Sequence, residues 1–152
     1  MHKSYFPTPE GCPEPLRALS RRRVRFEEVD PLGIVWHGRY PGYFEDARMA
    51  LGEKYGISYM VFHEQNVITP IRQFHADYLV PLSFGQEFTI EGIQHFSESA
   101  RINIEYIIRD QTGQITTRGY TVQMLLDRDK NILIALPEFF EEFCRRWKRG
   151  QL

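Results

Sequence analysis

The chain has 152 residues, of which 42% are apolar and 26% charged; these values predict one globular domain with a sizeable core rather than a disordered or fibrous chain. The formal net charge of −1 argues against nucleic acid or an anionic membrane surface as a partner. No apolar run approaches the roughly 18 residues that cross a bilayer, so we expect no membrane insertion. Cys12 and Cys144 are widely separated and no signal-peptide pattern is present, which favours a reduced, cytoplasmic protein.

The first 20 residues contain four of the nine prolines, and we expect them to form an irregular arm before a single domain of residues 21–152. In residues 21–29, Val24 and Phe26 alternate with arginine and glutamate, which predicts the first strand. The sequence Asp-Pro-Leu-Gly that begins at Asp30 is typical of a β-turn and would end this strand.

Apolar side chains recur every three or four residues between Gly38 and Tyr55, and this spacing predicts the main helix. Pro41 is compatible with a helix only in its first turn, so the helix should begin at about residues 38–40. Gly56 suits the left-handed conformation that often ends a helix. Much of the helix circumference is apolar, so we expect a sheet to wrap around it.

The second half of the chain has the alternating pattern of β-strands. After a short helix or loop at residues 58–65, we expect strands over 71–80, 86–93, 100–110 and 115–127, and a terminal helix over 137–147. The clearest strand has Ile102, Ile104, Tyr106 and Ile108 on one face, and the next has Tyr120, Val122, Met124 and Leu126 on one face. This order of elements predicts an α+β fold, an antiparallel β-sheet around one long helix.

One stretch combines the parts of a hydrolytic site. Asp30 lies seven residues before His37, which stands where the main helix begins. The first turn of a helix has free N–H groups and a partial positive charge, and both stabilise an oxyanion. A nearby carboxylate can attack an acyl carbon or deprotonate water, so these residues indicate acyl transfer to water. Taken alone, they leave open that Asp30 is only a turn residue and that His37 only flanks the helix.

The run "VRFEEVDPLGIVWHGRYPGYFEDARMALGEKYGIS" resembles the signature of hotdog-fold acyl-CoA thioesterases of the 4-hydroxybenzoyl-CoA thioesterase family, especially its Tol-Pal-associated branch. The likeness continues through "ITPIRQFHADYLVPLSFGQEFTI" and "RINIEYIIRD" and covers roughly residues 22–136. The sequence departs from the family pattern in having Arg39 instead of Asn, Pro41 instead of a helix former, and Trp36 instead of Tyr or Phe.

The resemblance implies a hotdog fold, a homodimer or homotetramer, and an active site at the dimer interface. It implies hydrolysis of an acyl-CoA, or of an acyl carrier protein thioester, to the free carboxylic acid without a metal or redox cofactor. Asp30 would be the catalytic carboxylate, as nucleophile or general base, and the backbone N–H of His37 and its neighbours would polarise the carbonyl. The candidate substrate-binding residues are Val35, Trp36, Gly38, Tyr40, Tyr43, Phe74 and Arg101.

Two other functions remain open at this level. A hotdog dehydratase acting on a 3-hydroxyacyl thioester would use His37 with Glu45, although Glu45 is expected to pair with Arg48 three residues later. The chain could also bind an acyl thioester without catalysis. His75 and Asp77 would share a face of a strand, but a third metal ligand at a recognisable spacing is missing.

The phosphates of CoA require cationic partners, for which arginine is well suited. Arg101, Arg118 and the basic clusters at residues 21–25 and 145–149 are equivalent candidates in the sequence.

Overall fold

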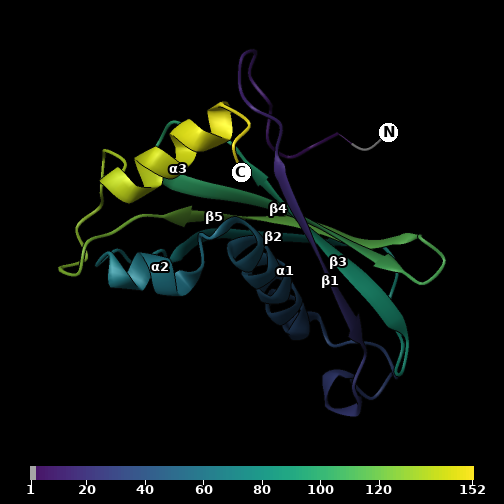
Figure 1. Ribbon diagram of the computed structural model, residues 1–152. Helices are drawn as coiled ribbons and strands as arrows, with labels where there is room; N and C mark the ends of the chain where they lie inside the picture. The colour runs from purple at the N-terminus through teal and green to yellow at the C-terminus, as the bar shows by residue number, and fades with distance from the viewer. Residues whose placement is uncertain (1–2) are drawn as a thin grey trace.

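The computed structural model describes residues 3–152 (Figure 1). Five antiparallel strands form one sheet in the order β1-β3-β4-β5-β2. The strands are β1 Leu16–Arg23, β2 Ile71–Tyr78, β3 Glu87–His95, β4 Arg101–Asp110 and β5 Ile115–Met124. The helices are the short 3-10 turns η1 Phe26–Glu28 and η2 His37–Arg39, followed by α1 Tyr40–Tyr55, α2 Tyr59–Glu64 and α3 Glu138–Lys148. None of the helices in residues 3–152 is both long and apolar enough to cross a bilayer.

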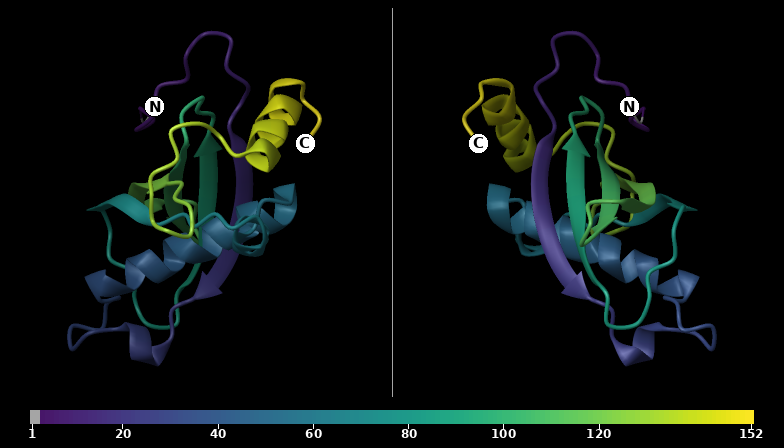
Figure 2. Two further views of the ribbon diagram at one scale, coloured as in Figure 1. Left: turned by 90° about the vertical axis from the view of Figure 1, so that its left-hand side faces the viewer. Right: turned by 90° about the vertical axis from the view of Figure 1, so that its right-hand side faces the viewer.

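Helix α1 lies across one face of the sheet, as the two side views in Figure 2 show. Its Phe44 stacks on Tyr106 of β4, with ring centroids 4.3 Å apart. Gly119 of β5 allows this approach, because a Cβ there would lie 2.8 Å from the Phe44 ring. The predicted apolar face of β4 is confirmed, since Ile102, Ile104, Tyr106 and Ile108 are all buried. One long helix wrapped by an antiparallel sheet is the hotdog fold.

The predicted main helix is confirmed, but the predicted first strand is wrong. Helix α1 begins at Tyr40 with Pro41 in its first turn, and Gly56 closes it with a φ of 68°. Strand β1 occupies residues 16–23 rather than 21–29 and pairs with β3 along its whole length. The backbone N–H of Arg25 donates to the Glu28 carboxylate, which closes the turn η1 where strand was expected.

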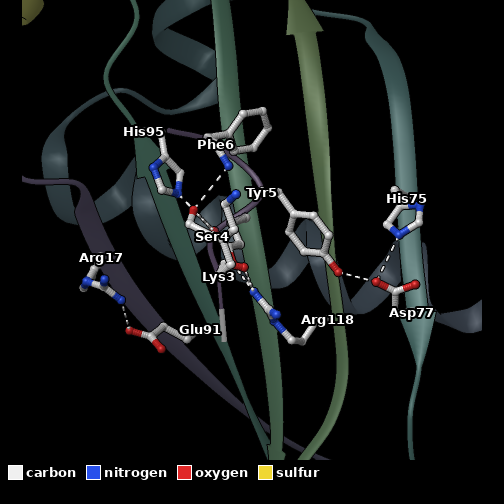
Figure 3. Close-up of polar contacts among 11 residues, drawn as sticks. Lys3, Ser4, Tyr5, Phe6, Arg17, His75, Asp77, Glu91, His95 and Arg118 are labelled. Carbon is white, nitrogen blue, oxygen red and sulfur yellow. Dashed lines mark hydrogen bonds and ion pairs between the residues drawn. The ribbon is translucent and has the colours of Figure 1, made fainter. Parts of the chain in front are cut away.

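The outer face of the sheet, opposite α1, is covered by the N-terminal residues (Figure 3). Glu105 of β4 is buried there and accepts hydrogen bonds from Ser4 (2.6 Å) and Arg118 (2.7 Å), with His95 Nε2 at 3.2 Å. Burial alone would raise the pKa of Glu105, but the hydrogen bonds of His95, Ser4 and Arg118 lower it to about 2. The N-terminal segment is therefore anchored to the sheet by a buried charge network.

Candidate active site

Asp30 begins a closed β-turn at the end of the sheet where β1 finishes. Its carbonyl accepts the N–H of Gly33 at 2.9 Å, and its Oδ1 accepts the N–H of Leu32 at 2.8 Å. Gly33 has a φ of 76°, which explains glycine at this position. The second carboxylate oxygen, Oδ2, has no hydrogen-bond partner among residues 3–152. The turn thus fixes the partly buried side chain and leaves one oxygen available for chemistry.

The turn is the tip of a small hairpin that leads into the main helix. The Asp30 N–H donates to the Ile34 carbonyl at 2.9 Å, and Val29 pairs with Val35 as an antiparallel bridge. The Val35 N–H donates to Leu82, and the Trp36 N–H donates to Glu28. Neither Val35 nor Trp36 therefore has a backbone N–H free for a substrate, although both are candidates from the sequence.

Two N–H groups at the start of the helical segment remain unpaired. The Arg39 N–H donates to the Trp36 carbonyl at 2.9 Å, but the N–H groups of His37 and Gly38 have no acceptor in the described part of the chain. Both residues are solvent-exposed. Two adjacent exposed donors at a helix start can hold an oxyanion. Of the donors predicted at His37 and its neighbours, the N–H groups of His37 and Gly38 are therefore the ones available.

Strand β2 contacts this pair of donors from the side. The Tyr78 hydroxyl donates to the His37 carbonyl at 3.1 Å, and this carbonyl belongs to the same peptide unit as the Gly38 N–H. The Tyr78 ring also packs against Tyr40, with centroids 4.8 Å apart. The Trp36 ring covers Gly38 so closely that a Cβ at Gly38 would overlap it. Tyr78 and Trp36 therefore hold the peptide between His37 and Gly38 in place.

A partly buried ion-pair network connects the hairpin to β1 and α1. The Glu28 side chain is 8% exposed and accepts from Arg22 at 2.9 Å, and Arg22 also donates to Asp46 of α1 at 2.6 Å. The Glu28 carbonyl in turn receives the Trp36 N–H. Sequence reasoning missed Glu28 and Tyr78, because neither contact has a signal in local spacing.

The other sequence candidates occupy three different environments. Tyr40 and Tyr43 are buried core residues, and burial followed by the charge of Glu28 raises the pKa of Tyr43. Phe74 on β2 is 41% exposed, with its ring 5.3 Å from that of Phe44. Arg101 is exposed at the start of β4, which is the end of the sheet opposite Asp30. One protomer therefore does not bring Arg101 to the Asp30 loop.

The alternative residues have structural partners. Glu45 accepts from Arg48 at 2.6 Å, as expected, and also from the Tyr59 hydroxyl at 3.1 Å. His75 and Asp77 lie 3.1 Å apart on β2, and Asp77 also accepts the Tyr5 hydroxyl (Figure 3).

Comparison with known proteins identifies a family for the chain. Residues 24–145 match the family model described as the thioesterase-like superfamily. A Bacillus subtilis (strain 168) protein named "Putative acyl-CoA thioesterase YneP" is 24% identical over 128 residues, which cover 84% of this chain and 93% of that protein. An Aquifex aeolicus (strain VF5) protein named "Putative esterase" is 33% identical over 72 residues, or 47% of this chain and 56% of that one.

Solved structures share the fold. The DHNA-CoA thioesterase from Staphylococcus aureus has a TM-score of 0.80 and 23% identity, with 89% of this chain and 91% of that chain covered. SAV2348 from Staphylococcus aureus, solved in complex with CoA, has a TM-score of 0.77 and 17% identity, with 91% and 88% covered. Because the family model spans most of the chain, this protein belongs to the thioesterase-like superfamily and has its hotdog fold.

Proposed function

We propose that the protein is an acyl-CoA thioesterase that hydrolyses its substrate to a free carboxylic acid and CoA, with Asp30 as the catalytic carboxylate. The observation that carries this proposal is the hairpin that joins the available Oδ2 of Asp30 to the unpaired N–H groups of His37 and Gly38. Membership of the thioesterase-like superfamily and the name of the Bacillus subtilis relative support the substrate class. The narrower assignment to the 4-hydroxybenzoyl-CoA family and its Tol-Pal-associated branch rests on the signature in residues 24–58.

The proposed chemistry places the thioester carbonyl oxygen between the N–H groups of His37 and Gly38. Asp30 takes a proton from water, and the water oxygen attacks the carbonyl carbon to give a tetrahedral oxyanion that the two N–H groups stabilise. The carbon–sulfur bond then breaks, and the CoA thiolate leaves and takes up the proton that Asp30 received from water. If Asp30 instead attacks the carbon directly, the acyl–Asp30 anhydride that forms is hydrolysed by water in a second step.

A hydrolysis panel tests this proposal. Wild type and Asp30→Asn are incubated with short, long, branched and aromatic acyl-CoAs, and free thiol is measured. We expect wild type to hydrolyse at least one class and Asp30→Asn to be slower by roughly 10²- to 10⁴-fold, the usual contribution of a general base. Absence of thiol release across the panel, or equal rates for both proteins, would refute the assignment. Label found in the Asp30 carboxylate after single turnover in ¹⁸O-water would establish direct attack, because general-base catalysis places the label only in the product acid.

We also propose that two copies pair through β2. This strand is at the edge of the sheet, its backbone pairs with β5 on one side only within residues 3–152, and Ile71, Phe74 and Tyr78 on it are exposed. Antiparallel pairing of β2 with its copy would place the start of one β2 beside the end of the other. The Arg101 end of one sheet would thus approach the Asp30 end of its partner. Light scattering of Ile71→Asp, which should weaken this pairing, tests the dimer and any tetramer built from it.

If Arg101 binds a CoA phosphate across this pairing, Arg101→Ala should raise KM for an acyl-CoA and leave KM for the matching acyl-pantetheine unchanged. Equal effects on both substrates would argue against phosphate binding. An acyl carrier protein thioester remains within the proposal as an alternative substrate and belongs in the same comparison. Cys12 and Cys144 are both free thiols, in keeping with the proposed cytoplasmic location.

A further inference from the structure

A cavity of about 270 Å³ lies between α1, α2 and the inner face of the sheet, apart from the Asp30 loop. Six of the residues that line it are aliphatic or carry a thioether, namely Met49, Leu51, Ile57, Met60, Ile102 and Ile104. Arg48 of α1 and Gln123 of β5 also line it, and both are at least nine-tenths buried. Arg48 follows Tyr40 by eight residues, which corresponds to about 12 Å along the helix. The cavity therefore lies farther along the helix that begins at the proposed oxyanion site.

Two residues of this wall each have a buried side-chain atom that lacks a partner among the described residues: Arg48 Nε and Gln123 Oε1. The Gln123 amide nitrogen donates to the Thr69 carbonyl at 2.7 Å, which fixes the amide orientation and makes the unpaired atom the oxygen. Arg48 Nη2 is already bound to Glu45, which leaves its Nε–H as the unpaired donor. An unpaired buried donor and an unpaired buried acceptor are both costly, and here both belong to residues of one cavity wall.

The chemistry of these two atoms restricts what would complement them. A carboxylate would accept from Arg48 but would be repelled by the Gln123 oxygen and the Glu45 carboxylate. An ammonium group would be repelled by Arg48. A hydroxyl both accepts and donates, so it is the smallest neutral group that can pair with both atoms.

The aromatic residues of the wall indicate that this hydroxyl is carried by an aliphatic chain. The Arg48 guanidinium lies 3.4 Å from the centroid of the Tyr59 ring and so occupies one face of it. Phe62 is buried and packs against Phe139 and Phe140, with centroids 5.2 and 5.5 Å away. The wall therefore favours flexible aliphatic contacts over stacking of a planar acyl ring.

We propose that this cavity binds the far end of the acyl group, and that the preferred acyl group is an aliphatic chain with a hydroxyl near its end. This inference rests on the proposed function for the identity of the ligand as an acyl group. It assigns the polar specificity of the site to Gln123 and Arg48, with Gln123 accepting the ligand proton and the Arg48 Nε–H donating to the ligand oxygen.

Calorimetric titration with two free acids tests the cavity without requiring catalysis. Decanoic acid and ω-hydroxydecanoic acid differ only by the terminal hydroxyl. We expect wild type to bind the hydroxy acid roughly 10- to 100-fold more tightly, because only this ligand pairs both buried atoms. Gln123→Met, which keeps the side-chain length, should lose most of this difference and keep its affinity for decanoic acid. Gln111→Met, in the exposed turn after β4, lies outside the cavity and should behave as wild type.

Equal affinities of wild type for the two acids overturn the proposal without any variant, so a poorly folded Gln123→Met cannot obscure the answer. An unchanged preference in folded Gln123→Met also overturns it. Met49 is exposed at the cavity, so Met49→Trp should fold and weaken binding of both acids; undiminished binding would place the acids elsewhere.

The hydrolysis of the matching acyl-CoAs distinguishes a failure of the cavity assignment from a failure of the proposed thioesterase activity. Hydrolysis with no preference for the hydroxyacyl chain would leave the thioesterase standing and refute the cavity assignment. Selective binding of the hydroxy acid with no hydrolysis would support the cavity assignment and refute the thioesterase.

Discussion

Two turns of this protein have the same local structure and different surroundings. Asp30 and Asp110 each accept, at the carbonyl, the N–H of a glycine three residues later, and each uses Oδ1 to accept the N–H two residues later. Gly33 and Gly113 both have positive φ, 76° and 86°. After the first turn the chain enters a helix start with free N–H groups, whereas after the second it enters strand β5. A turn that positions a carboxylate is therefore not specific to an active site. The segment that follows the turn determines whether the turn can form part of one.

The two carboxylates also differ in the number of hydrogen bonds that they accept. Asp110 Oδ1 receives three donors, from the Thr112 N–H and hydroxyl and from the Gln114 N–H. Asp30 Oδ1 receives one, from Leu32. A carboxylate with few donors has more of its oxygen lone pairs available to a water molecule or an acyl carbon, so the turn with fewer hydrogen bonds is the better candidate for chemistry.

The largest expected effect comes from exchanging the two acids for alanine. Asp30→Ala should reduce kcat by roughly 10²- to 10⁴-fold with a small change in the midpoint of thermal unfolding, because the side chain makes a single hydrogen bond. Asp110→Ala should leave kcat unchanged and lower the unfolding midpoint. Thiol release and thermal unfolding measured on both variants check this. Loss of activity in both variants would show that the turns matter only for folding.

The glycines give the next contrast. Gly38→Ala forces the Trp36 ring away from the helix start, and we expect the displaced oxyanion donors to lower kcat about tenfold. Gly113→Ala meets no steric contact within 4 Å but has a left-handed φ, so it should cost ~1 kcal/mol of stability and no activity. Steady-state kinetics with denaturant unfolding of both variants separates the effects. A Gly38→Ala enzyme with wild-type kcat would show that the Trp36 contact does not position the Gly38 N–H for catalysis.

The elements of this fold were largely predictable from sequence, because the periodicities of α1 and β4 are strong and Pro41 and Gly56 mark the helix ends. The first strand was not predictable, because residues 24–28 alternate as a strand does. Pairing with β3 instead favours residues 16–23, and the Glu28 carboxylate closes a turn at Arg25. Non-local hydrogen bonds therefore overrode a local pattern.

Prediction of the candidate site was limited in the same way. Asp30 and His37 could be chosen because turn and helix signals stand side by side in the chain. The occupied N–H groups of Val35 and Trp36 could not be foreseen, because their acceptors include Leu82, on a distant loop. Arg118 shows that the sequence does not reveal which charges are already paired. It is a candidate phosphate ligand in the sequence, but in the structure it is mostly covered and forms an ion pair with Glu105.

A smaller effect is expected from removing the contact between Tyr78 of β2 and the peptide between His37 and Gly38. Tyr78→Phe removes the hydrogen bond to the His37 carbonyl, which orients the adjacent Gly38 N–H. A net hydrogen bond of ~0.5–1.5 kcal/mol corresponds to a decrease in kcat of roughly 2- to 10-fold, with little change in KM. Tyr55→Phe, which removes a hydroxyl hydrogen bond to the Arg17 backbone carbonyl (3.1 Å), is the matched control and should retain wild-type kcat. Equal losses in both variants would indicate a general effect on packing.

The smallest effect concerns the pKa of Asp110 and serves as a control on the Asp30 comparison. The Thr112 hydrogen bonds, assisted by the N–H groups of Gln114 and Gly113, lower the pKa of Asp110 below its usual 3.8. Because the folded-state pKa is depressed, this contribution to stability is complete above about pH 3.8 and is lost as the pH falls through the folded-state value. Thr112→Val should raise the pKa of Asp110 in a carboxyl NMR titration, so that the stability lost on acidification is smaller and the loss is complete at a higher pH. Hydrolysis near neutral pH should not change, because Asp110 remains ionised there in both proteins. A change in kcat would mean that the Asp110 turn affects the active site, which would contradict the contrast between the two turns.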